Sequence, residues 1–147
     1  MTEPMIPGID YPGINITYYC HDGTGRYVFN LRGKNCRDEQ GKWDCGAGKL
    51  ELHQTIEECL RKEIKEEYCT DVLDYEFLGF DDVHREHNGV QTHWIGLRYR
   101  VRVDAKKVAN GEPHKFDDVQ WFTLDNLPSP LHSQVEDELR AYRDKLT

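Results

Sequence analysis

Residues 44–70 constrain the fold of this chain more than any other segment, because a glycine-rich loop there leads into a charged helix. The loop at 44–49 reads Asp-Cys-Gly-Ala-Gly-Lys and can bring bare backbone close to a ligand. Thr55 and Glu58 have the spacing of a capping box, which predicts a helix from Thr55 to about residues 67–69. The fold must therefore place this loop beside the helix that follows it.

The predicted helix has an apolar face and an acidic face. Its apolar stripe repeats at i, i+4 steps and is expected to face the core; it consists of Ile56, Leu60 and Ile64. Glu63, Glu66 and Glu67 fall at i, i+3 and i+4, so they occupy neighbouring positions on the acidic face. Like charges at these spacings cost an isolated helix about 0.2–0.5 kcal/mol per pair. Either the neighbouring cations compensate on a solvated face, or a divalent metal does; the cations are Arg61, Lys62 and Lys65.

The rest of the chain reads as alternating strands with one further helix. Strands are predicted at 14–20, 27–32, around Trp43 and Leu50, and at 72–80, 93–103 and 119–122. The charged segment 81–89 is predicted to be a loop. Ser133 and Glu136 form a second capping box, so a helix should run from Ser133 to about Leu146.

Size and charge favour a small enzyme. A chain of 147 residues suits one domain, with a core at about 14–146 and an N-terminal extension at 1–12. A net charge of -8 argues against stable nucleic-acid binding, and neither a membrane span nor a signal peptide is expected. Five scattered cysteines indicate free thiols in the cytoplasm, although Cys36 and Cys45 flank the loop and could be reactive.

The loop and helix together resemble the Nudix box, Gly-x5-Glu-x7-Arg-Glu-U-x-Glu-Glu-x-Gly-U, in which U is aliphatic. The leading glycine matches Gly48, and the catalytic core matches Glu63, Ile64, Glu66 and Glu67 without a gap. Four positions depart from the pattern: Gln54 for Glu, Lys62 for Arg, Cys69 for Gly and Thr70 for an aliphatic residue. The resemblance implies a Nudix α/β/α sandwich, a single α/β domain with a central mixed sheet.

The same resemblance implies the residues of the site. The metal, Mg²⁺ with Mn²⁺ as an alternative, would be held by Glu63, Glu66, Glu67 and the carbonyl of Ala47. Glu63 is a candidate general base, and these three glutamates form the expected catalytic set. Substrate contacts are expected from Arg32, Gly48, Lys49 and Lys62, although a surface arginine at a strand end is equally ordinary. A further carboxylate is left open among Glu112, Asp117 and Asp118.

A zinc site among the histidines is rejected on sequence grounds. His84, His87 and His93 cluster in the sequence, but His84 and His87 fall on the predicted loop with no thiol or second pair near them. Trp43 and Trp94 could stack on a base, although a core role is favoured for each.

Three functions remain open. The leading hypothesis is a MutT-type nucleoside triphosphate pyrophosphatase that acts on a small nucleotide; a homodimer is compatible with it. The second is a Nudix hydrolase for a nucleotide sugar, a dinucleoside polyphosphate or a capped nucleotide. The third is a catalytically impaired module that binds nucleotide, which Gln54 and Lys62 suggest.

Overall fold

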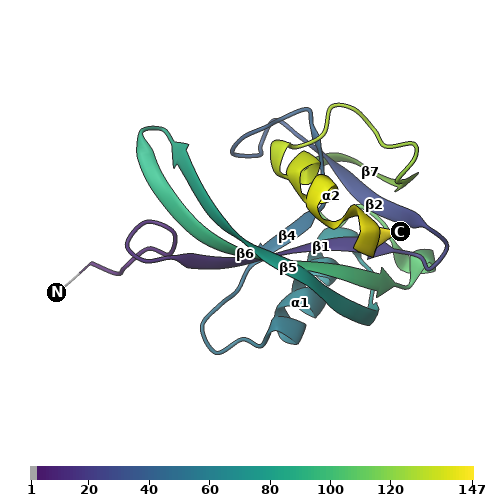
Figure 1. Ribbon diagram of the computed structural model, residues 1–147, viewed down its shortest axis with the longest axis horizontal. Helices are drawn as coiled ribbons and strands as arrows, with labels where there is room; N and C mark the ends of the chain where they lie inside the picture. Colours follow the sequence, from purple (N-terminus) through teal and green to yellow (C-terminus); the bar gives the residue numbers. More distant parts are fainter. Residues whose placement is uncertain (1–2) are drawn as a thin grey trace.

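A seven-stranded mixed sheet forms the centre of the computed structural model, which describes residues 3–147 (Figure 1). The strands are β1 (Gly13–His21), β2 (Arg26–Arg32), β3 (Trp43–Asp44), β4 (Gly46–Lys49), β5 (Val72–His87), β6 (Val90–Val103) and β7 (Phe116–Thr123). Helix α1 (Ile56–Tyr68) and helix α2 (Ser133–Leu146) lie on opposite faces of the sheet, and a short 3₁₀ turn, η1, covers Ala105–Lys107. This arrangement confirms the predicted mixed sheet between helices.

β1 organises the sheet because it pairs along both edges. It runs parallel to β6 from Gly13 to His21 and antiparallel to β4 from Asn15 to Tyr18. Alternate β1 side chains face opposite helices, as the period of a strand requires. Ile16, Tyr18 and Cys20 pack in the core under α1, whereas Tyr19 belongs to the core under α2. β4 therefore carries the glycine loop directly alongside the central strand.

Helix α1 forms as its sequence predicts. Thr55 is its N-cap, and both hydrogen bonds of the capping box with Glu58 are present. Leu60 and Ile64 are fully buried, and Ile56 packs at the edge of the same core. The helix ends at Cys69, which takes the left-handed conformation at φ 62° that glycine usually supplies.

Helix α2 has the predicted bounds but a different cap. The N-cap is His132, whose Nδ1 accepts a hydrogen bond from the N–H of Gln134 at 3.1 Å. The predicted capping box of Ser133 is wrong, because Ser133 Oγ donates instead to Glu39 Oε2 at 3.0 Å. Glu39 thereby ties the loop after β2 to the start of α2.

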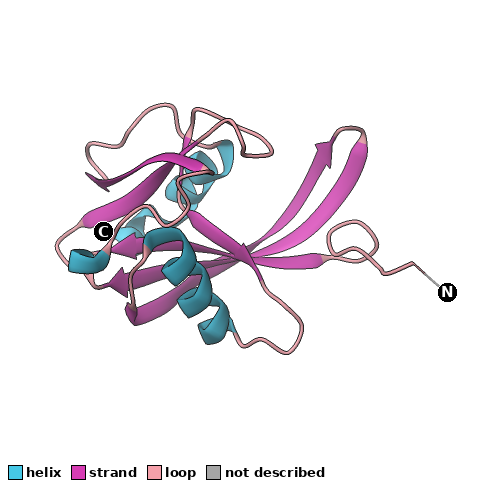
Figure 2. Cartoon of the chain, turned by 180° about the vertical axis from the view of Figure 1, so that it is seen from behind, coloured by secondary structure: helices cyan, strands magenta, loops and turns pink. Residues whose placement is uncertain are grey.

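The predicted loop at 81–89 is also wrong, since β5 and β6 form one long hairpin that extends beyond the sheet (Figures 1 and 2). Pairing continues to His87 and Val90, and the turn between them is Asn88-Gly89. Both turn residues have positive φ, 51° and 79°, as a two-residue hairpin turn of this type requires. The Asn-Gly dipeptide was the sequence signal for this turn.

The segment before β1 folds back against the hairpin. Gly8 and Gly13 both lie so close to the Trp94 ring that an added Cβ would come within 2.4 Å of it. The N–H of His93 donates to the carbonyl of Gly8 at 2.8 Å. Within residues 3–147, no helix is long and apolar enough to cross a membrane, and all five cysteines are free thiols.

Candidate active site

The glycine loop and the acidic face of α1 lie in direct contact. An added Cβ on Gly48 would come within 2.3 Å of Glu63 Cγ and 2.5 Å of its Cδ, so only glycine fits against this carboxylate. The N–H of Ala47 donates to Glu67 Oε1 at 3.2 Å. The predicted proximity of loop and helix is therefore present atom by atom.

Glu67 is the most deeply buried of the three helix glutamates. Its residue is 4% exposed, and its carboxylate accepts a hydrogen bond from the Tyr18 hydroxyl as well as from Ala47. Burial raises the pKa of Glu67 to about 8, while the Tyr18 hydroxyl and Lys115 act in the opposite direction. The hydrogen bonds from Tyr18 and from β4 thus offset part of the cost of burying this carboxylate.

Two lysines balance the charge of the carboxylates. Lys62 Nζ lies 3.5 Å from Glu63 Oε1 and 3.3 Å from Glu66 Oε1. Lys115 Nζ lies 3.4 Å from Glu112 Oε2 and 4.0 Å from Glu67 Oε2. Of the three cations expected to balance the acidic face, Lys62 contacts these glutamates, whereas Arg61 pairs with Glu57 and Lys65 with Asp71.

Burial is also the main reason that the pKa of Glu63 is raised. Lys62 lowers this pKa, whereas the charges of Glu66 and Glu112 raise it further. Glu112 has the same raising effect on the pKa of Glu67. The candidate site is therefore a group of mutually repelling carboxylates in a partly dehydrated setting.

Among the three further acids, the structure brings Glu112 to this group. Gly111 rests against α1, where an added Cβ would lie 2.0 Å from the backbone oxygen of Glu66. Asp118 accepts hydrogen bonds from the N–H of Val119 and from Gln120 within its own strand. Asp117 is exposed and lies beside Gly33.

The unusual box residue Gln54 acts within its own loop. Its Oε1 accepts a hydrogen bond from the N–H of Glu51 at 3.0 Å, and its N–H donates to the carbonyl of Glu51 at 3.1 Å. Lys62 interacts with helix carboxylates instead. These two substituted positions therefore have separate partners.

A cleft of about 460 Å³ extends from Glu63 to the β5–β6 hairpin. This volume falls within the usual range of small-molecule sites. Ala47, Gly48 and Glu63 line one part of it, and its basic lining residues are Arg32, Arg37, Lys49, Arg85 and Lys115. Lys62, which was expected to contact substrate, is not among the residues that line the cleft. The cleft thus joins carboxylates to a set of cationic side chains.

The predicted substrate residue Arg32 is already paired. Its guanidinium donates to Asp38 Oδ1 at 2.9 Å, to Asp44 Oδ2 at 3.1 Å and to the Asp38 carbonyl at 3.0 Å. Lys49 lies 3.8 Å from Glu51 Oε1 and is half exposed. Arg32 therefore shapes the wall of the cleft, and Lys49 stands at its edge.

Sequence reasoning missed several residues of this site. Tyr18 and Lys115 come from β1 and from the loop before β7, and no local motif distinguishes either residue. Val83, Arg85 and His87 line the cleft from alternate positions of β5, and Glu86 joins them near the hairpin turn. Recognition of the Asn-Gly turn would have predicted that alternation.

An all-oxygen donor set fits the metal that the resemblance implies. Mg²⁺ prefers oxygen and is usually bound by one or two carboxylates, with water and substrate phosphates in its remaining positions. Glu66, Glu67 and the Ala47 carbonyl are oxygen donors of this kind, and burial raises the pKa of Glu67. The donor types therefore suit a hard divalent cation, although the ligand oxygens of Glu63, Glu66 and Glu67 do not all lie within 4.8 Å of one another in this structure.

Comparison with known proteins identifies the family of this fold. Residues 12–144 match the NUDIX domain family, and the chain belongs to it. A MutT NUDIX hydrolase structure from Burkholderia pseudomallei superposes with a TM-score of 0.76 at 25% identity, covering 88% of this chain and 97% of that one. The MutT protein of Methanosarcina mazei Go1 has a TM-score of 0.72 at 19% identity, with 91% and 95% covered, and supports the fold.

Two curated relatives are similar over part of their length. The NAD-capped RNA hydrolase NudC of Pseudomonas aeruginosa is 28% identical over 104 residues, which are 71% of this chain and 34% of the relative. The oxidized purine nucleoside triphosphate hydrolase of Danio rerio is 32% identical over 92 residues, 60% of this chain and 53% of the relative. The chain thus spans about a third and about half of these relatives. Both relatives are named as hydrolases.

Proposed function

We propose that the protein is a Mg²⁺-dependent nucleoside triphosphate pyrophosphatase that releases nucleoside monophosphate and pyrophosphate. The observation that carries the proposal is the cleft in which Glu63 of α1 meets a cationic wall, with Glu66 and Glu67 on the same helix just outside its lining. A nucleotide presents a chain of anionic phosphates and an uncharged base, so it needs both metal and basic residues. Similarity to the Danio rerio hydrolase and to MutT structures supports this substrate class.

In this proposal Glu66, Glu67 and the Ala47 carbonyl hold the metal, with Mn²⁺ as an alternative to Mg²⁺. The bound ion neutralises phosphate charge and makes a water molecule more acidic. Tyr18 and the Ala47 N–H fix the orientation of the Glu67 carboxylate. Gly48 allows the loop to remain in contact with Glu63.

Glu63 is proposed to orient the attacking water and accept its proton. The pKa of this carboxyl is raised by burial, which makes it a better base than an exposed glutamate. Glu112 is proposed as the further carboxylate, since Lys115 links it to Glu67. Asp117 and Asp118 provide controls on the same stretch of chain.

Arg37 and Arg85 are proposed to bind phosphates together with Lys49 and Lys115. Within residues 3–147, Arg37 is the one arginine or lysine of the cleft that has no carboxylate oxygen within 4.0 Å. The guanidinium of Arg85 lies 3.3 Å from Glu39 Oε2, but the side chain is 39% exposed and can therefore turn toward a ligand. The loop after β2 and the hairpin would then close on the phosphate chain from two sides.

The reaction products test this function directly. Nucleoside triphosphates, including oxidised purines, are incubated with and without Mg²⁺ in ¹⁸O-labelled water. We expect metal-dependent monophosphate and pyrophosphate, with the label confined to one of these two products. Orthophosphate as the sole first product would contradict the proposal.

Variants test the assigned ligands. Glu66→Gln and Glu67→Gln should each abolish most turnover while the circular dichroism spectrum is kept. Glu57→Gln is the matched control, because Glu57 lies on the same helix but contacts Arg61 and Tyr75. Near-normal turnover and unchanged metal dependence in either ligand variant would remove the ligand assignment.

Two observations favour specific alternatives. Similarity to NudC favours NAD-capped RNA or a related dinucleotide, so nucleotide sugars, dinucleoside polyphosphates and NAD belong in the same substrate screen. The contacts of Lys62 with both Glu63 and Glu66 favour a module that binds nucleotide without turnover. Nucleotide binding without product in any of these reactions would establish that alternative.

The five free cysteines support a reducing cytoplasm as the proposed location.

A further inference from the structure

The β5–β6 hairpin carries a second cluster of metal-ligating side chains on the face away from the cleft. Val83, Arg85 and His87 line the cleft, whereas Asp82 and His84 occupy the alternate, exposed positions. His93 on β6 stands directly opposite His84 in the strand register. Because opposed residues of an antiparallel pair share a face, these three side chains project together.

The three side chains already converge on one point. His93 Nε2 lies 2.6 Å from Asp82 Oδ1, and His84 Nε2 lies 3.1 Å from the same oxygen. The two imidazole rings stack with centroids 4.1 Å apart at an angle of 19°. Their ligand atoms all lie within 4.8 Å of one another, and within residues 3–147 this is the one group of three or more His, Cys, Asp or Glu side chains that does so.

From this geometry we propose that Asp82, His84 and His93 bind a divalent transition metal ion such as Zn²⁺, at a site separate from the α1 glutamates. Imidazole nitrogen is a preferred ligand for Zn²⁺, Cu²⁺ and Ni²⁺, and a carboxylate oxygen completes a common zinc donor set. Mg²⁺ selects oxygen donors instead. The two clusters therefore differ in the metal that each prefers.

The fit requires at least one imidazole ring to turn out of the stacked arrangement, because parallel rings cannot both direct an Nε2 lone pair at one ion. Zn²⁺ bonds to nitrogen and oxygen are about 2.0–2.2 Å, so tetrahedral ligand atoms stand roughly 3.3–3.5 Å apart. The contacts of 2.6 and 3.1 Å to Asp82 are slightly shorter, and the three side chains are at least one third exposed, so each can adjust. A cation would replace the side-chain hydrogen bond between His93 and Asp82.

A metal at this site would bridge the two strands of the hairpin. His84 belongs to β5 and His93 to β6, so an ion bound by both would link the two strands one residue pair from Arg85 and Thr92. The opposite face of the same segment forms part of the cleft wall. The proposed ion is thus structural, and it would rigidify the hairpin that borders the candidate active site.

The sequence argument against zinc rested on a loop that does not exist. His84 and His87 were considered as a pair, but in a strand they point to opposite faces. The relevant partner of His84 is His93, which is close only because the Asn88-Gly89 turn folds the chain back.

Metal binding by the full, untagged chain tests the proposal. Zn²⁺ is titrated against a chromophoric chelator in excess Mg²⁺, which occupies the oxygen-rich glutamate site. We expect one Zn²⁺ per chain. Its affinity should fall at least about tenfold in Asp82→Asn, His84→Asn and His93→Asn, since removal of outer partners alone costs 10–100-fold.

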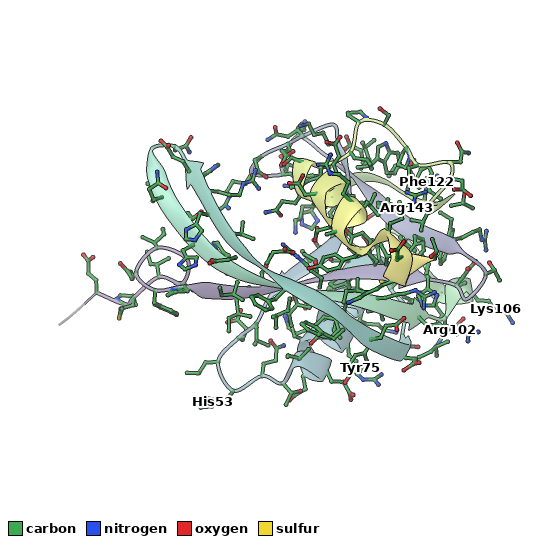
Figure 3. The ribbon with its side chains drawn as sticks, in the orientation of Figure 1. His53, Tyr75, Arg102, Lys106, Phe122 and Arg143 are labelled. Atoms are coloured by element: carbon green, nitrogen blue, oxygen red, sulfur yellow. The ribbon has the colours of Figure 1, made fainter. Side chains whose placement is uncertain are left out.

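His53→Asn and His114→Asn are matched controls because both histidines are exposed and lie elsewhere in the chain. Figure 3 shows His53 on the loop before α1, well away from the hairpin tip. Both controls should retain Zn²⁺. Loss of binding in a control, unchanged binding in the three ligand variants, or no stoichiometric Zn²⁺ in the parent chain would overturn the proposal.

A second readout locates the ion. In histidine ring NMR spectra, one equivalent of Zn²⁺ should shift the resonances of His84 and His93 and leave those of His53 unchanged. Amides of residues 84–93 should exchange more slowly with Zn²⁺ present, and a chelator should reverse this. Shifts centred on Ala47 and Gly48 instead would place Zn²⁺ at the glutamates and refute the hairpin site.

Discussion

Removal of the Tyr18 hydroxyl should reveal how much the site depends on the position of Glu67. Tyr18 is 1% exposed, and its hydroxyl donates to the buried Glu67 carboxylate. Tyr18→Phe keeps the ring and its packing against Tyr68, so the change is confined to one hydrogen bond. The Glu67 carboxylate then retains the N–H of Ala47, 3.2 Å away, and the more distant Lys115.

The size of the effect follows from burial. Loss of one donor to a buried polar group costs about 1–3 kcal/mol of unfolding free energy. For a domain of this size each kcal/mol lowers Tm by about 2–4 °C. A positioning residue behind a metal ligand also contributes about 10–100-fold to metal affinity or activity. Tyr18→Phe should therefore lose both stability and turnover.

Tyr19→Phe is the matched control for this change. Tyr19 is also 1% exposed and donates to a buried carboxylate, Glu138 Oε2 at 3.2 Å, but it faces α2. Unfolding in urea and Mg²⁺ dependence of kcat are measured for both variants. We expect both to lose stability and only Tyr18→Phe to need more Mg²⁺. Equal retention of turnover and metal dependence would refute the assigned role of Tyr18.

Three further outcomes are expected. Cys69→Gly should raise the free energy of unfolding by about 1 kcal/mol, because Cys69 has φ 62°, whereas Cys69→Ala should not; chemical denaturation compares them. Gly111→Ala should destabilise by about 1–3 kcal/mol and reduce turnover, since its Cβ would lie 2.0 Å from the Glu66 carbonyl oxygen; unchanged turnover would separate this loop from the site. Burial opposes ionisation of Glu39, yet the Ser133 N–H and nearby cations lower its pKa from 4.5 to about 2. Its ionised form therefore adds stability above pH 4.5, about 1–2 kcal/mol after solvent screening, which is lost as the pH falls toward 2. Glu39→Gln should be less stable at pH 6 and should lose this difference near pH 2 in denaturation curves.

The elements that could be predicted from the sequence are those with local causes. The capping box of Thr55 and Glu58 places the start of α1, and the i, i+4 apolar stripe determines which side faces the core. The glycine loop meets the helix because only glycine fits against Glu63. Local chemistry also indicated the strained end of α1 at Cys69.

The errors come from contacts between distant segments. Ser133 has the spacing of an N-cap, but Glu39, 94 residues earlier, takes its hydroxyl, and His132 caps the helix instead. The contribution of Tyr18 depends on β1 passing under Glu67, a partner 49 residues away. No pattern within one segment indicates such pairings, so the charge balance of the site could be described only from the folded structure.

The lysine at position 62 explains how four carboxylates coexist before a metal binds. An arginine would form a flat, two-pronged pair with one carboxylate, whereas Lys62 places a single ammonium between Glu63 and Glu66. Its side chain is 54% exposed, so its release into water is inexpensive. Lys115 plays the same part for Glu67 and Glu112 and is 42% exposed. A metal ion bound here would therefore compete with two weakly held ammonium groups, and we expect the substitution at position 62 to alter metal affinity without removing a ligand.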